Sequence, residues 1–510
     1  MKYLKNIIVS ITKMVNYSCD KCGKTFKQKG HYMKHLQRKN PCDNIKDKIE
    51  NIVDKLVKEK LQDLVEKGDI EIKNKNLISN NQNSNIENTE MEDKKLKFID
   101  LFCGIGGFHQ ALSEEGYECV FASDIDEKCR ETYKNNYGIK PEGDITKVNI
   151  KEIPDFNILC GGFPCQPFSK AGNQEGFDDK RGNLFFTICD IVKYHKPEYI
   201  ILENVRNLAT HGQVKGDTWK TIKENINKLN YHTYDNPLIL NTLHFNVPQS
   251  RERAVILCVR KDIGELPEIP KIPKIVKSKL SVSINDIIHD NEEYNENYKI
   301  TEREENVIKI WDDFIDILNK NEIVVPKFPI WTDWWDSDGD NTNICKLDEK
   351  ITHEDNLIKI KDKKENFYNK YKSWIDKNRE FYNNNKVHLE GWLNTSRENK
   401  HWYGTLRKFE WQVQKKNVNL SDNIFTFRPS GIRVKDPNYT PTLVAMSHIP
   451  IVGYLRRRLS PRECLNLQSF DPDFKLSEND KDTYKQAGNA VNKKMINACI
   501  NLLINKKPLF

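Results

Sequence analysis

No apolar run in the 510-residue sequence approaches the roughly 20 residues that a membrane-spanning helix requires. The apolar stretch 7–11 is also too short for the core of a secretory signal peptide, and no small-residue cleavage site follows it. The thirteen cysteines are odd in number and lack the regular spacing of a secreted disulfide scaffold. We therefore expect an intracellular protein with reduced thiols and no membrane contact.

Positive charge is concentrated at one end of the chain. Residues 1–44 contain ten Lys or Arg against two Asp, which gives this segment a net charge of +8. Because the whole chain carries +7, the remainder is close to −1. A local excess of this kind favours contact with a polyanion near the N-terminus.

Residues 43–94 read as a helix followed by a flexible linker. Apolar side chains recur at helical spacing over residues 45–66, among Lys, Glu and Asp. This stripe fits a helix that rests on a neighbouring surface better than a self-pairing coil, because it lasts only about three heptads. Residues 73–94 are rich in Asn, Lys, Ser and Glu and almost lack apolar side chains, which is typical of a linker.

From residue 95 the pattern changes to strands that alternate with helices. Apolar runs predict buried strands at 98–102, 119–123, 156–160, 198–202 and 254–259, and helical patterns lie at 126–137, 184–195 and 217–229. This alternation predicts an α/β fold, with a mainly parallel sheet and helices on both faces. It stops between about 265 and 450, where eight of the nine tryptophans fall and predict a separate core. Helical patterns return after 455.

A glycine-containing turn follows the first of these strands. Gly104, Gly106 and Gly107 let the backbone approach a ligand closely, although such a turn serves many nucleotides or packing alone. Asp124, at the end of the next strand, is placed to accept hydrogen bonds from ribose hydroxyls. Asp144 follows the third expected strand position, near enough to meet an adenine amino group.

A second motif, residues 161–169, directly follows the strand at 156–160. It contains Cys165 between Pro164 and Pro167, which fix an extended, exposed loop. A free cysteine is by itself most often a small buried apolar residue. In such a loop a nearby helix N-terminus or cation would instead raise its thiolate fraction.

Two further motifs lie beside predicted strands. Glu203 follows the strand at 198–202, where a helix-capping or surface carboxylate is the simplest reading. Arg251 and Arg253 precede the strand at 254–259 and face the same side, as at a solvated or phosphate-facing edge. Together with Cys165 they suit pyrimidine chemistry: a thiolate adds to carbon 6, an acid serves ring nitrogen 3, and a guanidinium stabilises the carbonyl oxygen.

From Phe98 to about Val491 the chain resembles the DNA cytosine-5 methyltransferases. The matching motifs, in the family's order, are Pro164–Gln166, Glu203–Val205, Gln249–Arg253, Arg458–Glu463 and Tyr484–Val491. The resemblance implies a Rossmann-like, S-adenosylmethionine-dependent sheet of seven strands and a second domain across a DNA-sized cleft. It implies that Cys165 attacks carbon 6, Glu203 contacts nitrogen 3 and Arg253 contacts the cytosine carbonyl, with Arg251 beside it. The implied cofactor contacts are Phe102, Gly104, Ile105, Gly107, Asp124, Ile125, Asp144, Ile145, Pro164, Leu184, Asn489 and Val491.

The resemblance also divides the chain. Residues 95–264 and 451–510 correspond to the two parts of the catalytic domain, and 265–450 to the separate target-recognition domain. Within the latter, Thr440–Leu443 is similar to the family's threonine–leucine element. Four arginines are candidates for groove or phosphate contacts, and surface charge is an equal explanation for each one singly: Arg428, Arg433, Arg456 and Arg457.

Residues 17–42 resemble a zinc finger. Cys19, Cys22 and His35 match its first three ligands, and Cys42 replaces the second histidine after a longer gap than usual. His31, one helical turn before His35, is an alternative fourth ligand. The lysines around this module favour contact with nucleic acid, and a protein-binding role stays open.

The predicted function is methylation of cytosine carbon 5 in a specific double-stranded DNA sequence, in a restriction–modification or viral system. A cognate restriction endonuclease would act on the same site without direct contact, and we expect a monomer during catalysis. Relatives that methylate transfer RNA carry a Cys-Phe-Thr tripeptide, which is absent here. A third hypothesis, a DNA-binding protein with an inactive methyltransferase fold, conflicts with the presence of Cys165, Glu203 and Arg253.

Overall fold

A computed structural model describes residues 17–18, 25–26, 95–164, 184–212, 216–269, 271–276, 280–335, 354–413, 418–445 and 448–510, with the backbone alone at 17–18, 25–26, 292 and 354–368. The chain divides into two units, residues 1–91 and 92–510. In the first unit, β1 (Tyr17–Ser18) pairs antiparallel with β2 (Thr25–Phe26). Several predictions lie outside the described residues: the zinc ligands Cys19, Cys22, His35 and Cys42, the helix 45–66, the linker 73–94, and Cys165.

The second unit contains a seven-stranded sheet, with the order β4-β3-β5-β6-β10-β7 and with β8 also paired to β10. Its strands are β3 (Lys97–Leu101), β4 (Glu118–Ser123), β5 (Ile158–Gly161), β6 (Tyr199–Val205), β7 (Tyr231–Thr233), β8 (Leu238–Asn241) and β10 (Glu252–Arg260). Strands β4, β3, β5 and β6 are parallel, and β10 runs antiparallel to β6, β7 and β8. Six strands therefore share one direction, which confirms the mainly parallel sheet, and β10 alone is reversed.

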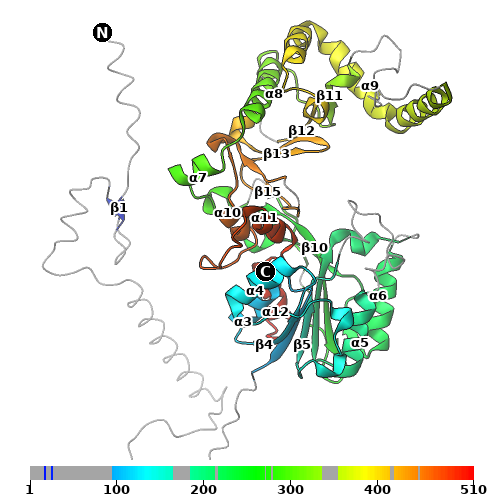
Figure 1. Cartoon of the computed structure of the whole chain (residues 1–510), viewed down its shortest axis with the longest axis vertical. Coiled ribbons are helices and arrows are strands. Elements are labelled where there is room, and N and C mark those ends of the chain that lie inside the picture. Colours follow the sequence, from blue (N-terminus) through cyan, green and yellow to red (C-terminus); the bar gives the residue numbers. More distant parts are fainter. Residues whose placement is uncertain are drawn as a thin grey trace, which may run out of the picture. The chain divides into compact units, whose positions relative to one another are not determined.

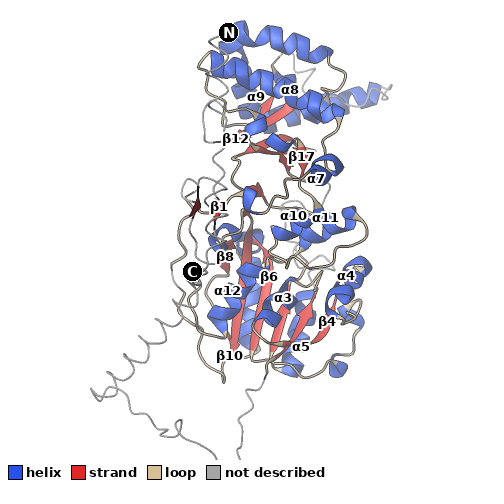
Figure 2. Cartoon of the chain, turned by 90° about the vertical axis from the view of Figure 1, so that its left-hand side faces the viewer, coloured by secondary structure: helices blue, strands red, loops and turns tan. Residues whose placement is uncertain are grey.

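Helices cover both faces of this sheet (Figures 1 and 2). Alternate strand residues point to opposite faces, so Leu159 joins a core with α5 and α6, whereas Cys160 joins a core with α3 and α12. The helices are α3 (Gly107–Glu114), α4 (Glu127–Tyr137), α5 (Leu184–His195), α6 (Asp217–Lys228) and α12 (Lys493–Leu503). All five strands and three helices predicted for 98–259 are confirmed to within about three residues.

A second sheet of six strands has the order β11-β12-β14-β13-β16-β17. Its strands are β11 (Ile330–Trp331), β12 (Lys408–Gln412), β13 (Ile424–Arg428), β14 (Gly431–Lys435), β16 (Ile451–Val452) and β17 (Arg457–Arg458). Helices α8 (Glu302–Lys320) and α9 (Glu354–Glu398) pack on one face of it, and the short α7 (Glu292–Asn297) precedes them (Figure 1). Five of the eight tryptophans lie in this core, as predicted, whereas Trp374 is 46% exposed.

Short elements join the two sheets. Strand β15 (Thr440–Pro441) pairs in parallel with β9 (Gln249–Ser250), directly before the Arg251–Arg253 segment. Helices α10 (Pro461–Asn466) and α11 (Asp480–Asn489) share a core with Ile424 of the second sheet and Leu443 after β15. Among the described residues, no helix is both long and apolar enough to cross a bilayer.

One of the four arginines proposed as DNA contacts is placed inside this junction. Arg457 is 0% exposed and forms two 2.9 Å bonds to the carboxylate of Glu463, which is equally buried. Its remaining donors bind Asn295 and the carbonyls of His289 and Arg458. The suggestion of a DNA contact is wrong for Arg457, because all its donors are committed to holding the junction together.

Candidate active site

Glu203 and Arg253 meet at the carboxyl edge of the first sheet. Glu203 lies near the end of β6, and Arg253 lies near the start of β10. Because β10 runs in the opposite direction, its start reaches the edge where β6 ends, and both side chains point to the face covered by α12. Arg253 Nε lies 2.7 Å from Glu203 Oε1, with side chains only 12% and 10% exposed. A carboxylate and a guanidinium are thus held together at an edge where ligands of parallel sheets commonly bind.

The loop that leads to Cys165 is fixed beside this pair. A Cβ placed on Gly162 would lie 3.7 Å from Glu203 Oε2 and 3.3 Å from a methyl group of Val491. On the other face of β6, Asn204 Nδ2 donates a 3.3 Å hydrogen bond to the carbonyl oxygen of Phe163. The described loop ends at Pro164, which is partly buried, one residue before Cys165.

The glycine turn after β3 is organised around the carboxylate of Asp124. Its two oxygens accept hydrogen bonds of 2.8 Å from the backbone N–H groups of Gly104 and Asp126. Burial raises the pKa of Asp124, although these two donors oppose that rise. Gly104 has a φ of +53°, and no atom lies within 4 Å of a Cβ built there, so the turn faces open space. Ile125, next to Asp124, is 77% exposed, which is unusual for a large apolar side chain.

Other predicted cofactor residues lie around the same edge. Asp144 is near the end of β4, because the backbone of Glu142 bonds to those of Ala122 and Asp124. Two hydrogen bonds from Thr146 hold the pKa of Asp144 below its ordinary value. The rest differ in exposure: Ile105 and Ile145 are buried, Phe102 and Leu184 are partly buried, and Asn489 is exposed.

Gly107 and Val491 are in close backbone contact. A Cβ on Gly107 would lie 2.4 Å from the carbonyl oxygen of Val491, so only glycine fits at the start of α3. Gly106, with a φ of +88°, likewise has the ring of Tyr137 where its Cβ would be. The segment after α11 is thereby held against the glycine turn, although the two are more than 380 residues apart in sequence.

The structure does not place Arg251 beside Arg253 at the Glu203 carboxylate. Arg251 is 1% exposed and donates hydrogen bonds of 2.8–3.2 Å to the carbonyl oxygens of Leu443, Gly488 and Ala490. It therefore joins the segment after β15 to the end of α11. The sequence offered no signal for this role, because the three acceptors are backbone groups about 190 to 240 residues away.

Asn204 and Gln249 were given no individual role from the sequence, although both lie within matched motifs. Gln249 is fully buried, donates to the carbonyl of Leu467 and accepts from the N–H of Leu443. The alternation of side chains along β6 places Asn204 on the face opposite Glu203. That alternation, applied to the motif, would have pointed to a supporting role for Asn204.

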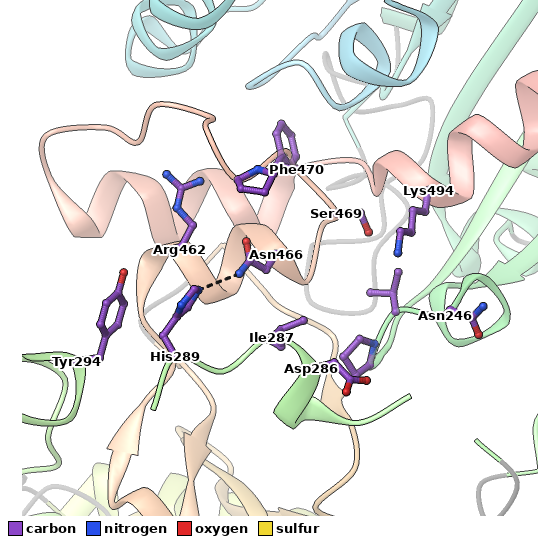
Figure 3. Close-up of a pocket in the computed structure, with 13 residues that line it drawn as sticks. Asn246, Asp286, Ile287, His289, Tyr294, Arg462, Asn466, Ser469, Phe470 and Lys494 are labelled. Carbon is purple, nitrogen blue, oxygen red and sulfur yellow. Dashed lines mark hydrogen bonds between the residues drawn. The ribbon is translucent and has the colours of Figure 1, made fainter. Parts of the chain in front are cut away.

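A cavity of about 490 Å³ lies elsewhere in the second unit (Figure 3). There His289 and Asn466 face each other across a 3.3 Å hydrogen bond, and none of the predicted site residues lines the cavity. Among the residues that the structure describes, no cluster of three or more His, Cys, Asp or Glu side chains could hold a metal ion.

The chain is similar to known proteins over most of its length. Residues 96–505 match the C-5 cytosine-specific DNA methylase family. The type II methyltransferase M.BanI of Aneurinibacillus aneurinilyticus is 33% identical, over 82% of this chain and 98% of its own. M.AluI of Cellulosimicrobium cellulans is 31% identical, over 78% and 90% respectively. M.HhaI of Haemophilus parahaemolyticus is 48% identical over a shorter stretch, which covers 34% of this chain and 53% of that protein. The chain is therefore an enzyme of the C-5 cytosine-specific DNA methylase family.

Proposed function

We propose that this protein methylates carbon 5 of cytosine within a specific double-stranded DNA sequence, with S-adenosylmethionine as the methyl donor and Cys165 as the covalent nucleophile. The observation that carries the proposal is the Glu203–Arg253 pair beside the Gly162–Pro164 loop that leads to Cys165. The Asp124 turn lies at the same edge of the same sheet. The groups proposed for the base chemistry and those proposed for cofactor binding therefore lie at the same edge of the sheet.

The residues at the Asp124 turn fit S-adenosylmethionine. Asp124 is pre-oriented by two backbone donors and suits ribose hydroxyls, and the open space at Gly104 leaves room for the ligand. The exposed side chain of Ile125 offers an apolar surface for the adenine ring. Asp144, Asn489 and Val491 would complete the site. When bound, S-adenosylmethionine supplies a methyl group activated by its sulfonium centre.

The protein's own groups would activate the cytosine ring. The thiolate of Cys165 adds to carbon 6, which makes carbon 5 nucleophilic toward the methyl group. Glu203 holds a proton at ring nitrogen 3, and Arg253 stabilises negative charge at the ring carbonyl. Once carbon 5 carries the methyl group, its proton is released to solvent and the bond between the Cys165 sulfur and carbon 6 breaks, which restores the aromatic ring and the thiolate. The target base must leave the duplex for these groups to reach it.

We further propose that residues 265–450 recognise the DNA sequence. A second sheet with its own tryptophan core, tied to the catalytic edge through β15 and β9, supports this assignment. We expect one copy of the chain to act on each site. We also expect a restriction endonuclease that cuts the unmethylated sequence, without contact between the two proteins.

The test is bisulfite sequencing of DNA from cells that express the wild type or Cys165→Ser. We expect complete 5-methylcytosine at one short motif with the wild type and none with the variant, whose affinity for S-adenosylmethionine is retained. A fluorinated cytosine oligonucleotide should trap the wild type covalently. If the folded wild type binds cofactor yet modifies no DNA, the proposed substrate is wrong.

For the N-terminal module we propose a structural zinc ion bound by Cys19, Cys22, His35 and Cys42. Its support is the ligand spacing and the antiparallel pairing of β1 with β2, which bracket Cys19 and Cys22 in the sequence. Metal analysis of the full chain should give one zinc per protein, and Cys19→Ser should lose it.

Deletion of residues 1–44 should weaken DNA binding and its salt dependence and leave the methylated motif unchanged. An altered motif would make the module a specificity element.

A further inference from the structure

Two arginines in the second sheet converge on one carboxylate. Arg433 of β14 places Nε 2.6 Å from Glu410 Oε2, and Arg428 of β13 places a terminal nitrogen 3.0 Å from Glu410 Oε1. The side chains are only partly exposed, at 32%, 18% and 17% for Arg433, Arg428 and Glu410. Two positive charges share one negative charge, so the cluster carries a net charge of +1.

The strand register explains how both arginines reach Glu410. Arg433 is directly opposite Glu410 on the neighbouring strand β12. Arg428 is one strand further away, because the order is β12-β14-β13, and its direct neighbour on β14 is Gly431. Because Gly431 has no side chain, none stands between Arg428 and β12 at this position of β14. A Cβ at Gly431 would also lie 2.5 Å from Lys408, so this position accepts only glycine.

The cluster lies on the face of the sheet that is not packed against α8 and α9. Along β13, Phe425 points into the core with these helices, whereas Ile424, Thr426 and Arg428 share the opposite face. At Ile424, the first residue of β13, this face packs into the core that also contains Leu443 and Ala490. The face that bears Arg428 and Arg433 is therefore the same face that packs against Leu443 and Ala490.

Arg433 is also close in sequence to a segment that lies at the sheet edge carrying Glu203 and Arg253. Thr440 lies seven positions after Arg433 and pairs with Gln249, four positions before Arg253. Seven residues span at most about 25 Å. A recognised sequence of several base pairs, at about 3.4 Å per pair, covers a similar distance. A duplex whose target base is at Glu203 would thus present neighbouring base pairs within reach of this face.

We propose that Arg433 reads a guanine of the recognised sequence in the major groove, that Glu410 is its positioning residue, and that Arg428 supports the same contact. Glu410 occupies the Nε edge of the Arg433 guanidinium. The two terminal nitrogens of Arg433 are then available as a fork for guanine O6 and N7. An arginine held by a carboxylate loses little further side-chain freedom on binding. This inference rests on the proposed function, DNA cytosine methylation by this chain.

The test begins with the motif that the full-length wild-type enzyme methylates. Oligonucleotide duplexes are then made with each guanine of the motif replaced in turn by 7-deazaguanine, which lacks the N7 acceptor. Single-turnover rates at subsaturating DNA are compared for wild type, Arg433→Ala, Arg433→Lys and Glu410→Gln. The lysine variant keeps the positive charge beside Glu410 and so guards against a folding defect. Arg303→Ala, on α8 behind the sheet, is the control for loss of one positive charge.

We expect 7-deazaguanine at one position to slow the wild type about 5- to 150-fold, the range of one bidentate base contact. Arg433→Ala should be insensitive to that replacement, and bisulfite sequencing should show its motif relaxed at that position. Arg433→Lys should keep only part of the sensitivity, because its ammonium still donates to N7 but lacks the planar fork. Glu410→Gln should lose part of the discrimination, and Arg303→Ala should behave as wild type.

Other outcomes overturn the proposal. If Arg433→Ala weakens all substrates equally and Arg433→Lys restores them, Arg433 contacts a phosphate and not a base. If neither variant changes rate or motif, the cluster has only a structural role. Absence of methylation by the wild type would instead remove the proposed function itself.

Discussion

The side-chain amide of Asn204 donates a hydrogen bond of 3.3 Å to the carbonyl oxygen of Phe163, two residues before Cys165. Asn204 is 1% exposed and Phe163 is 3% exposed, so this bond is shielded from solvent. Its neighbour Glu203 points to the other face of the same strand. Adjacent residues of β6 thus supply the proposed acid, Glu203, and an anchor for the loop that leads to Cys165.

Asn204→Ala should lower kcat about 10- to 100-fold with a smaller change in KM, because a displaced nucleophile costs rate more than binding. Steady-state methylation of an oligonucleotide measures both parameters. Asn157→Ala is the matched control, since Asn157 bridges Lys97 and Glu198 at the opposite edge of the same sheet. An equal loss of kcat in both variants would show a general effect on the sheet.

Glu203→Gln should reduce the single-turnover methylation rate by about 10²- to 10⁴-fold, the range for a positioned acid. The amide keeps the size of the side chain beside Arg253 but carries no charge and cannot exchange a proton with the ring. Glu252→Gln serves as the control because Glu252 forms a solvent-exposed pair with Arg206 at the same sheet edge, three positions before Val255, which is directly opposite Glu203. A near-normal rate for Glu203→Gln would contradict the assigned role.

Gly107→Ala should weaken S-adenosylmethionine binding at least about 10-fold and lower the melting temperature. The new methyl group would meet the Val491 carbonyl at 2.4 Å, and overpacking of this kind costs about 1–3 kcal/mol. Gly391→Ala should instead stabilise the protein, by about 0.5–1 kcal/mol. Gly391 lies inside α9, and no atom lies near the position that its Cβ would take. Calorimetric titration and thermal unfolding would test both variants.

His109 should make the protein sensitive to acid. Burial lowers the pKa of His109 to about 4, and its ring stacks on Tyr137 and bonds to Tyr133. The unfolded chain binds this proton near pH 6.5, so the neutral ring contributes its stability above that pH. The contribution, about 3 kcal/mol, is lost as the pH falls from about 6.5 to about 4.

Urea unfolding of wild type and His109→Gln between pH 7 and pH 4 tests this prediction. The two free-energy curves should converge toward pH 4, because the variant has no imidazole to protonate. Parallel curves over this range would show that another group dominates the acid response.

The sequence predicted five of the seven strands of the first sheet and missed the short β7 and β8. A buried strand is a continuous apolar run and an amphipathic helix has its own period, so both leave a local signal. The reversed direction of β10 left none, because an apolar run reads the same for either direction. That reversal matters to the proposed function, since it brings Arg253 to the edge where Glu203 lies.

By itself, the sequence determined the family and the candidate groups, because Cys165, Glu203 and Arg253 stand in ordered motifs beside predicted strands. The tertiary structure decided which charged groups are free to meet a substrate. Residue type alone does not distinguish four arginines of this chain: Arg251, Arg253, Arg433 and Arg457. Folding binds Arg251 to backbone carbonyls and Arg457 to Glu463, leaves Arg253 beside Glu203, and orients Arg433 on Glu410. The physical reason is that a buried charge must find its partners, and these come from segments far apart in the chain.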